Sequence, residues 1–155
     1  MEDESTFNAL VLLLGHRNFR VTEHEATKTS EESAQVRGTT LDSGAKAMLL
    51  KEGVNFVLAV MSAARKLDSG RFKKLIKCKN LKFASEEEVW NLTKCIPGAV
   101  PPFGSLWGIR TYMDESLRAQ GDSINFNAGL RTRSVFISLQ DYVEIENPII
   151  GEFTK

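Results

Sequence analysis

The sequence has few histidines, few cysteines and no excess of charge of either sign. It contains two histidines and two cysteines in 155 residues, and its 20 basic residues balance its 20 acidic ones. Two histidines cannot make a histidine-rich metal site, and Cys78 and Cys95 lack metal-ligand spacing, so we expect reduced thiols and no metal. Zero net charge excludes a global field that would draw nucleic acid or a membrane surface. Any nucleic-acid contact therefore needs a local patch.

Long apolar runs and targeting signals are also missing. The apolar run at 9–14 is too short to span a bilayer, and the acidic start (MEDE) is unlike a secretory signal. We therefore expect a cytoplasmic protein with no membrane contact. With 42% hydrophobic and 26% charged residues, the chain fits a single domain over 1–155.

The common catalytic motifs are absent as well. No nucleophile elbow, Walker loop, GxGxxG or HExxH sequence occurs. A site must therefore be sought in less familiar patterns.

Proline is concentrated in one stretch, residues 96–105 (IPGAVPPFGS), which holds three of the four prolines and two glycines. Proline fixes φ and removes a donor, while glycine permits a close backbone approach, so a stiff, preset loop is expected here. Such a loop could hold a small polar ligand. It could equally be a rigid turn that places Val100 and Phe103 in the core.

Periodicity and capping residues predict a mixture of helices and strands. Helices are expected over 5–14, from a Thr29 cap to Arg37, over 69–77, from a Ser85 cap to about 94, and from a Ser138 cap through Tyr142. Strands are expected over 18–26, 46–50, 56–61, 81–84, 107–113, 124–127 and 134–137, followed by a loosely held tail over 147–155. The strands over 46–50 and 56–61 should form a hairpin with Gly53 in its turn. This irregular order favours a mixed or antiparallel sheet flanked by helices.

Two further pieces carry candidate chemistry. Lys46 comes two residues after Gly44, at the entry of a strand with few other charges. There it could hold a phosphate or carbonyl oxygen or simply face outward at a strand edge. Asn127, followed by Ala128 and Gly129, could bind a ligand edge or make a turn.

The segment 66–82 is basic, with seven Lys and Arg residues and a single acid, Asp68. It is either a solvated helix face or a patch for a phosphate backbone, in which Lys73, Lys74 and Lys77 would be the contacts.

Three of these pieces, taken in order, resemble the free-standing aminoacyl-tRNA deacylases of the YbaK/EbsC group, which are related to the editing domain inserted in bacterial prolyl-tRNA synthetases. They are residues 43–46 (SGAK), 98–104 (GAVPPFG) and 126–129 (FNAG), and Gly98 with Pro102 matches the GxxxP loop of that group. Several relatives carry a histidine-proline pair where this chain has 123–126 (SINF), so their substrate choice does not transfer.

The resemblance implies an α/β fold with a curved, barrel-like mixed sheet, and hydrolysis of the ester on a mischarged tRNA without a cofactor. It implies that Lys46 binds the terminal phosphate or the ester carbonyl, and that Gly98 orients the reacting groups through its backbone. It implies substrate contacts from Ala99, Val100, Pro101, Pro102, Phe103, Gly104, Asn127 and Gly129. The implied partners are aminoacyl-tRNA and an aminoacyl-tRNA synthetase.

Two other function classes stay open. The chain could be a binding or regulatory module of this fold without catalysis. It could also be a different hydrolase that uses Ser43 or Ser105 with His24.

Overall fold

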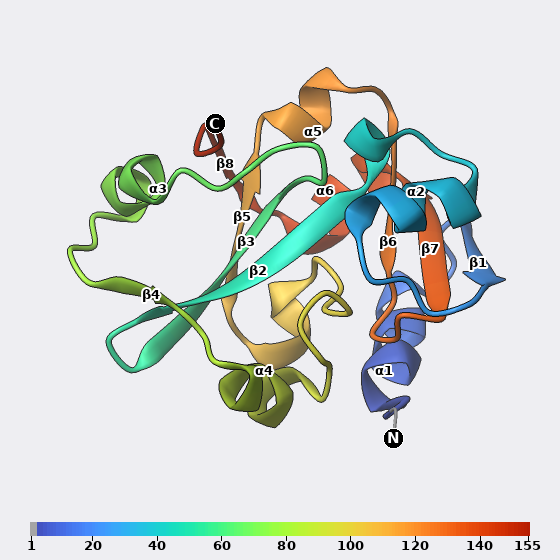
Figure 1. Cartoon of the computed structure of the whole chain (residues 1–155), viewed down its shortest axis with the longest axis horizontal. Helices are drawn as coiled ribbons and strands as arrows, with labels where there is room; N and C mark the ends of the chain where they lie inside the picture. Colours follow the sequence, from blue (N-terminus) through green and yellow to red (C-terminus); the bar gives the residue numbers. More distant parts are fainter. Residues whose placement is uncertain (1–2) are drawn as a thin grey trace.

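The computed structural model describes residues 3–155, which form six α-helices, two short 3₁₀ helices and eight strands (Figure 1). The helices are α1 (Ser5–Leu14), α2 (Ser30–Arg37), η1 (Leu41–Ser43), α3 (Ser69–Ile76), α4 (Glu86–Thr93), η2 (Gly104–Trp107), α5 (Ser116–Ala119) and α6 (Leu139–Glu146). The strands are β1 (Phe19–Glu23), β2 (Ala45–Glu52), β3 (Asn55–Ser62), β4 (Leu81–Phe83), β5 (Arg110–Asp114), β6 (Ser123–Asn127), β7 (Arg133–Ser138) and β8 (Ile149–Gly151).

The strands pair into two sheets. One has three antiparallel strands in the order β1-β7-β6, and the other is mixed, with the order β4-β2-β3-β5-β8. An isolated bridge between Gly44 and Asn125 joins the start of β2 to β6. The predicted mixed α/β class is therefore confirmed. Because the pairings among residues 3–155 leave two open sheets, the barrel-like curvature stays a prediction.

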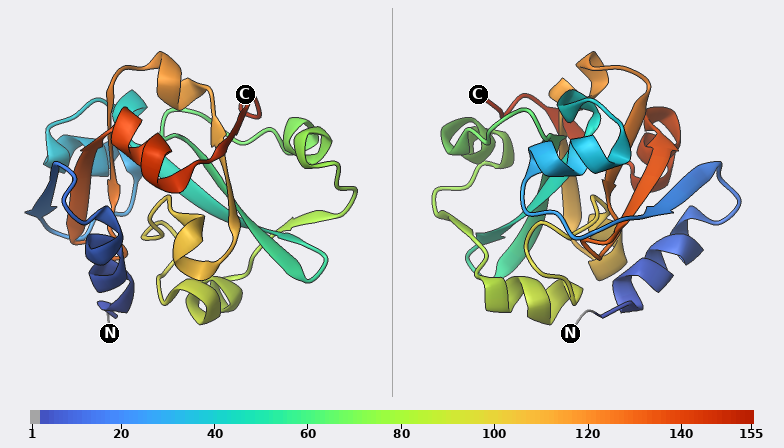
Figure 2. Two further views of the ribbon diagram at one scale, coloured as in Figure 1. Left: turned by 180° about the vertical axis from the view of Figure 1, so that it is seen from behind. Right: turned by 45° about the vertical axis from the view of Figure 1, so that its right-hand side comes forward.

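Alternation along β2 and β3 divides the core in two. Leu49, Leu58 and Val60 pack with apolar residues of β6, β7, α1 and α6, between the two sheets. Their strand neighbours point to the opposite face of the sheet. There, Leu50, Val57 and Met61 pack with residues of α3, β5 and the C-terminal segment. Accordingly, α1 and α3 lie on opposite sides of the molecule in both views of Figure 2.

Capping residues and glycines set where several elements begin and end. Thr29 accepts a hydrogen bond from the Glu32 amide at the start of α2, and Gly38 ends that helix at φ 68°. A reciprocal capping box between Ser85 and Glu88 begins α4. The predicted hairpin is β2–β3, with Gly53 in its turn.

Two predicted boundaries are wrong. The strand expected over 107–113 begins only at Arg110, because the chain first makes η2 and then turns at Gly108, whose φ is 68°. The helix capped by Ser138 continues to Glu146, past the predicted end at Tyr142.

The prediction of a loosely held tail over 147–155 is also wrong. This segment forms β8, which pairs parallel with β5, and Phe153 is fully buried against Phe72. The buried carboxylate of Asp114 accepts hydrogen bonds from the Phe153 amide and the Thr154 hydroxyl. A short segment without periodicity is thus fixed by partners that lie far away in the sequence.

Candidate active site

A cavity of about 360 Å³ opens beside the first half of β2. Because β4 pairs with β2 only at 50–52, the edge of β2 at 45–49 is left without a strand partner on that side. The cavity meets this edge, so six consecutive residues, 44–49, contribute to its wall. Further parts of the wall come from 27–37 (the approach to α2 and α2 itself), from the proline- and glycine-rich loop at 96–105 (the Pro/Gly loop) and from β6.

The wall of this cavity carries basic groups without acidic ones. Among the described residues that line it, Lys28, Arg37, Lys46 and Arg131 are cations and none is Asp or Glu. The Nε atom of Arg131 is buried with no hydrogen-bond partner within residues 3–155. Such a wall favours a ligand that brings its own negative charge or electron-rich oxygens.

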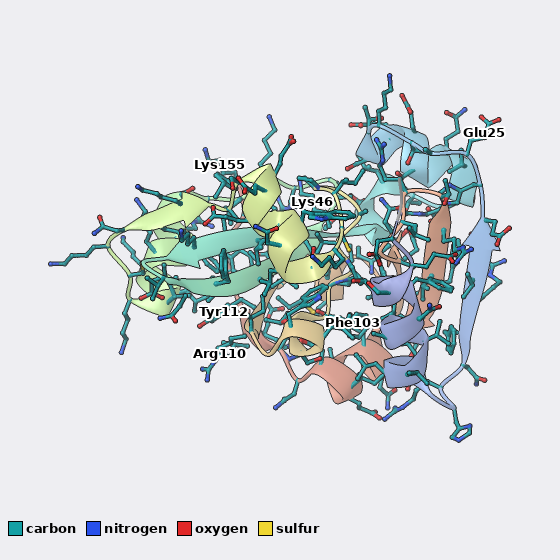
Figure 3. The ribbon with its side chains drawn as sticks, turned by 90° about the horizontal axis from the view of Figure 1, so that it is seen from below. Glu25, Lys46, Phe103, Arg110, Tyr112 and Lys155 are labelled. Carbon is teal, nitrogen blue, oxygen red and sulfur yellow. The ribbon has the colours of Figure 1, made fainter. Side chains whose placement is uncertain are left out.

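Lys46 is the second residue of β2, at the end of the strand that approaches the three-stranded sheet (Figure 3). Burial lowers the pKa of Lys46 below its ordinary value of 10.5, repulsion by Lys66 lowers it further, and Glu31 opposes the shift. No hydrogen bond or ion pair joins its ammonium group to another residue in 3–155. Lys46 is therefore a partly desolvated charge that a ligand in the cavity can bind.

The Pro/Gly loop is divided between cavity and core. Pro97, Gly98 and Val100 line the cavity. The positive φ of Gly98, 91°, favours glycine, and a Cβ there would meet no atom within 4 Å. Its amide N–H has no backbone partner among the described residues. Gly98 therefore presents an open, unobstructed backbone at the cavity.

The remaining loop residues pack behind this surface. Phe103 is fully buried against Phe126 and Tyr142, and the Tyr142 hydroxyl donates to the carbonyl of Pro102 over 2.6 Å. A Cβ on Gly104 would lie 2.5 Å from the Thr111 hydroxyl, so only glycine fits. Val100 and Phe103 both pack in the core, as the rigid-turn alternative describes, and Val100 also lines the cavity. Of the six predicted substrate contacts in the loop, five lie outside the cavity wall: Ala99, Pro101, Pro102, Phe103 and Gly104.

Residues 126–129 form hydrogen bonds with the Pro/Gly loop. Asn127 lines the cavity, and its side-chain amide donates to the carbonyl of Gly98 over 2.7 Å. The Gly129 amide donates to the carbonyl of Ala99 over 2.9 Å. Gly129 does not line the cavity, since a Cβ there would meet Thr6 and Phe7 of α1. The structure thus brings together Lys46, Gly98, Val100 and Asn127 of the predicted site, while their roles stay predictions.

Arg37 is the residue that sequence reasoning missed. Its guanidinium donates to Asn125 and Asn127 of β6 over 3.0 and 2.8 Å, and to Ser134 of β7 over 2.7 Å. No carboxylate pairs with it within residues 3–155, and burial lowers the pKa of Arg37 from 12.5 to about 10. An arginine in the last turn of a helix is common, because its positive charge interacts favourably with the helix dipole. No sequence signal therefore shows that Arg37 is buried at a site.

The predicted basic patch lies apart from the cavity. Lys73 and Lys74 belong to the last turn of α3, and Lys77 ends it in the left-handed conformation. None of the three lines the cavity wall. Lys66, which begins the basic segment, is close enough to Lys46 to affect its pKa.

The alternative serine-hydrolase site is wrong. His24 contacts Ser134 and the carbonyl of Glu25, and neither predicted serine. Ser43 instead contacts Thr40 and Asn125, and Ser105 donates to Glu146. No group of three potential metal-binding side chains exists among residues 3–155, and the two cysteines are free and buried.

The family follows from the sequence comparison. The model of the aminoacyl-tRNA editing domain matches residues 24–145, so the chain belongs to this family. It is 36% identical, over 97% of its own length and 93% of the relative, to the multifunctional Ser/Thr-tRNA deacylase ProXp-y of Escherichia coli (strain K12). It is 31% identical over 63% of its length to a proline–tRNA ligase of Bacillus licheniformis, of which it covers 17%.

Solved structures show the same fold. The crystal structure of a proposed trans-editing enzyme for prolyl tRNA synthetase superposes with a TM-score of 0.86, at 22% identity, over 97% of this chain and 98% of that one. No helix within residues 3–155 has the length and apolarity to cross a membrane.

Proposed function

We propose that this protein is a trans-editing aminoacyl-tRNA deacylase, which hydrolyses the ester between a wrongly attached small amino acid and the terminal adenosine of a tRNA. The observation that carries the proposal is the cavity in which Lys46, Gly98 and Asn127 meet. Membership of the editing family and the named activity of the Escherichia coli relative support it.

Ester hydrolysis needs a positioned nucleophile and stabilisation of the negative charge that develops on the carbonyl oxygen. Lys46 offers an unpaired positive charge in a partly dehydrated wall, where it stabilises this oxygen more than it would in water. The open backbone of Gly98, held through its carbonyl by Asn127, orients the aminoacyl group and the attacking water. The ribose hydroxyl of the substrate assists the attack, so no protein base is required.

Small hydroxyl-bearing amino acids suit the cavity. Its volume, about 360 Å³, is at the small end of the range for ligand sites. Thr27 and Ser33 line it, and their hydroxyl groups contact each other over 2.6 Å. Each hydroxyl can still bond a further group, which favours serine or threonine over alanine. The name of the Escherichia coli relative points the same way.

The tRNA backbone would then follow the basic segment. Lys66 connects the cavity electrostatically to this segment, and Lys73, Lys74 and Lys77 extend it along α3. A synthetase is a further candidate partner, since the chain resembles part of a proline–tRNA ligase. A cytoplasmic location accords with such substrates.

A deacylation panel tests the proposal. Purified protein is mixed with tRNAs that carry labelled alanine, cysteine, serine, threonine or proline, and release of the amino acid is followed over time. We expect rapid release of serine or threonine. A folded protein that binds aminoacyl-tRNA and releases none of the five would instead be the inactive binding module.

A further inference from the structure

Phe83 is an aromatic side chain left exposed at the cavity. It is 62% exposed and lines the cavity, although it belongs to a paired strand. Of the large apolar side chains exposed within residues 3–155, it is the only aromatic and the only one that lines the cavity. It belongs to neither core cluster and stacks on no other described ring. One face of its ring is therefore available to a ligand.

The backbone fixes the position of Phe83. It pairs with Leu50 of β2, and the next amide, that of Ala84, donates to the carbonyl of Leu49 over 3.0 Å. Side chains two apart on a strand share a face, so Lys46 and Leu50 lie on one side of β2, and Phe83 lies on that side too. Leu50 is four positions beyond Lys46 along the strand, which corresponds to about 13 Å between their backbones. Phe83 and Lys46 thus stand at two ends of the same cavity.

The ligand that fits both ends has a flat aromatic ring at one end and a polar, electron-rich group at the other. Bases stack on exposed aromatic side chains without needing a hydrogen-bonding code. A wall with four cations and no carboxylate accepts the oxygens of a nucleotide ester. A nucleoside ester has this form, with a flat base at one end and ester oxygens at the other.

We propose that Phe83 stacks on the terminal adenine of the tRNA while the aminoacyl ester reaches Lys46. This inference rests on the proposed function and adds to it the subsite for the base. It also gives the ester one direction in the cavity, because the adenine stays at the rim and the amino acid lies inside.

Binding of an analogue that cannot be hydrolysed tests the subsite without requiring turnover. The analogue is adenosine with serine joined to its 3′ position by an amide, and its dissociation constant is measured by titration calorimetry. Loss of a stacked base weakens binding about 5- to 150-fold. We expect such a loss for Phe83→Ala and near wild-type binding for Phe83→Trp. Val54→Ala is the matched control, because Val54 is 87% exposed and lies outside the cavity.

A second analogue with no base on the ribose completes the test. It should bind the wild type as weakly as the full analogue binds Phe83→Ala, and Phe83→Ala should bind both analogues equally. The inference is overturned if the wild type does not bind the adenosine analogue, or if Phe83→Ala binds it within twofold of the wild type. Failure of the proposed function would appear separately, as the absence of release in the deacylation panel.

Discussion

Lys46 and Arg37 both face the cavity, and they differ in what holds them. Lys46 comes from the five-stranded sheet and has no polar partner in the described chain, whereas Arg37 comes from α2 and donates to three side chains of the three-stranded sheet. Burial lowers the pKa of both, and neither is paired with a carboxylate within residues 3–155. A charge with no partner is available to substrate, while a charge with three partners organises the wall.

Arg37 acts on the loop through one side chain. Its guanidinium donates to the oxygen of Asn127, which turns the amide nitrogen of Asn127 toward the carbonyl of Gly98. Only this orientation of the amide satisfies both neighbours, because a guanidinium can only donate and a carbonyl can only accept. We therefore propose that Lys46 contributes to the chemistry and that Arg37 aligns Asn127 and Gly98.

The largest expected effect is the loss of catalysis in Lys46→Ala. Removing one group that stabilises a developing oxyanion costs about 10²–10³ in kcat. Folding should be unharmed, because burial disfavours the charge that is removed. Single-turnover deacylation measures the loss of catalysis, and the midpoint of thermal unfolding measures the stability of the variant.

Lys46→Arg provides the control. If positive charge is what matters, the wild-type rate should fall as pH rises through the lowered pKa of Lys46, which lies below 10.5, and Lys46→Arg should keep its rate there. Rates are corrected for spontaneous ester hydrolysis. Equal activity of wild type and Lys46→Ala would remove Lys46 from the mechanism.

Arg37→Met should show the opposite balance, with a smaller effect on the chemistry and a larger one on the fold. Methionine fills similar space but leaves the acceptors on Asn125 and Asn127 without a donor, while Ser134 keeps its contact with His24. An unsatisfied buried polar group costs about 1–3 kcal/mol, and urea unfolding would measure this loss. Arg37→Lys keeps the positive charge but lacks the planar guanidinium with its several donors, so it should recover only part of the lost stability. Wild-type stability of Arg37→Met would contradict a holding role.

The sequence predicted the parts of the site that local patterns reveal. A glycine before a lysine at a strand start, and prolines crowded into one loop, pointed to Lys46 and Gly98, and the structure brings both to one cavity. Arg37 escaped prediction because its acceptors lie 88 to 97 residues further along the chain. Local periodicity contains no trace of such pairings.

The fold shows the same limit. The capped helices and the β2–β3 hairpin follow from neighbouring residues, and these were predicted. The C-terminal segment depends on Asp114, some 39 residues from Phe153, and on Phe72, so it was expected to be loose. The loop was ambiguous for a related reason. Its first half faces the cavity and its second half the core, a division that composition does not reveal.

The most direct test of the account is a crystal structure of the protein with the non-hydrolysable seryl-adenosine amide. We expect the carbonyl oxygen of the serine within hydrogen-bonding distance of the Lys46 ammonium group, about 2.7–3.2 Å, with the Arg37 hydrogen bonds to Asn125, Asn127 and Ser134 intact. A carbonyl oxygen bound by Arg37, with Lys46 turned away into solvent, would contradict the division of roles between the two cations.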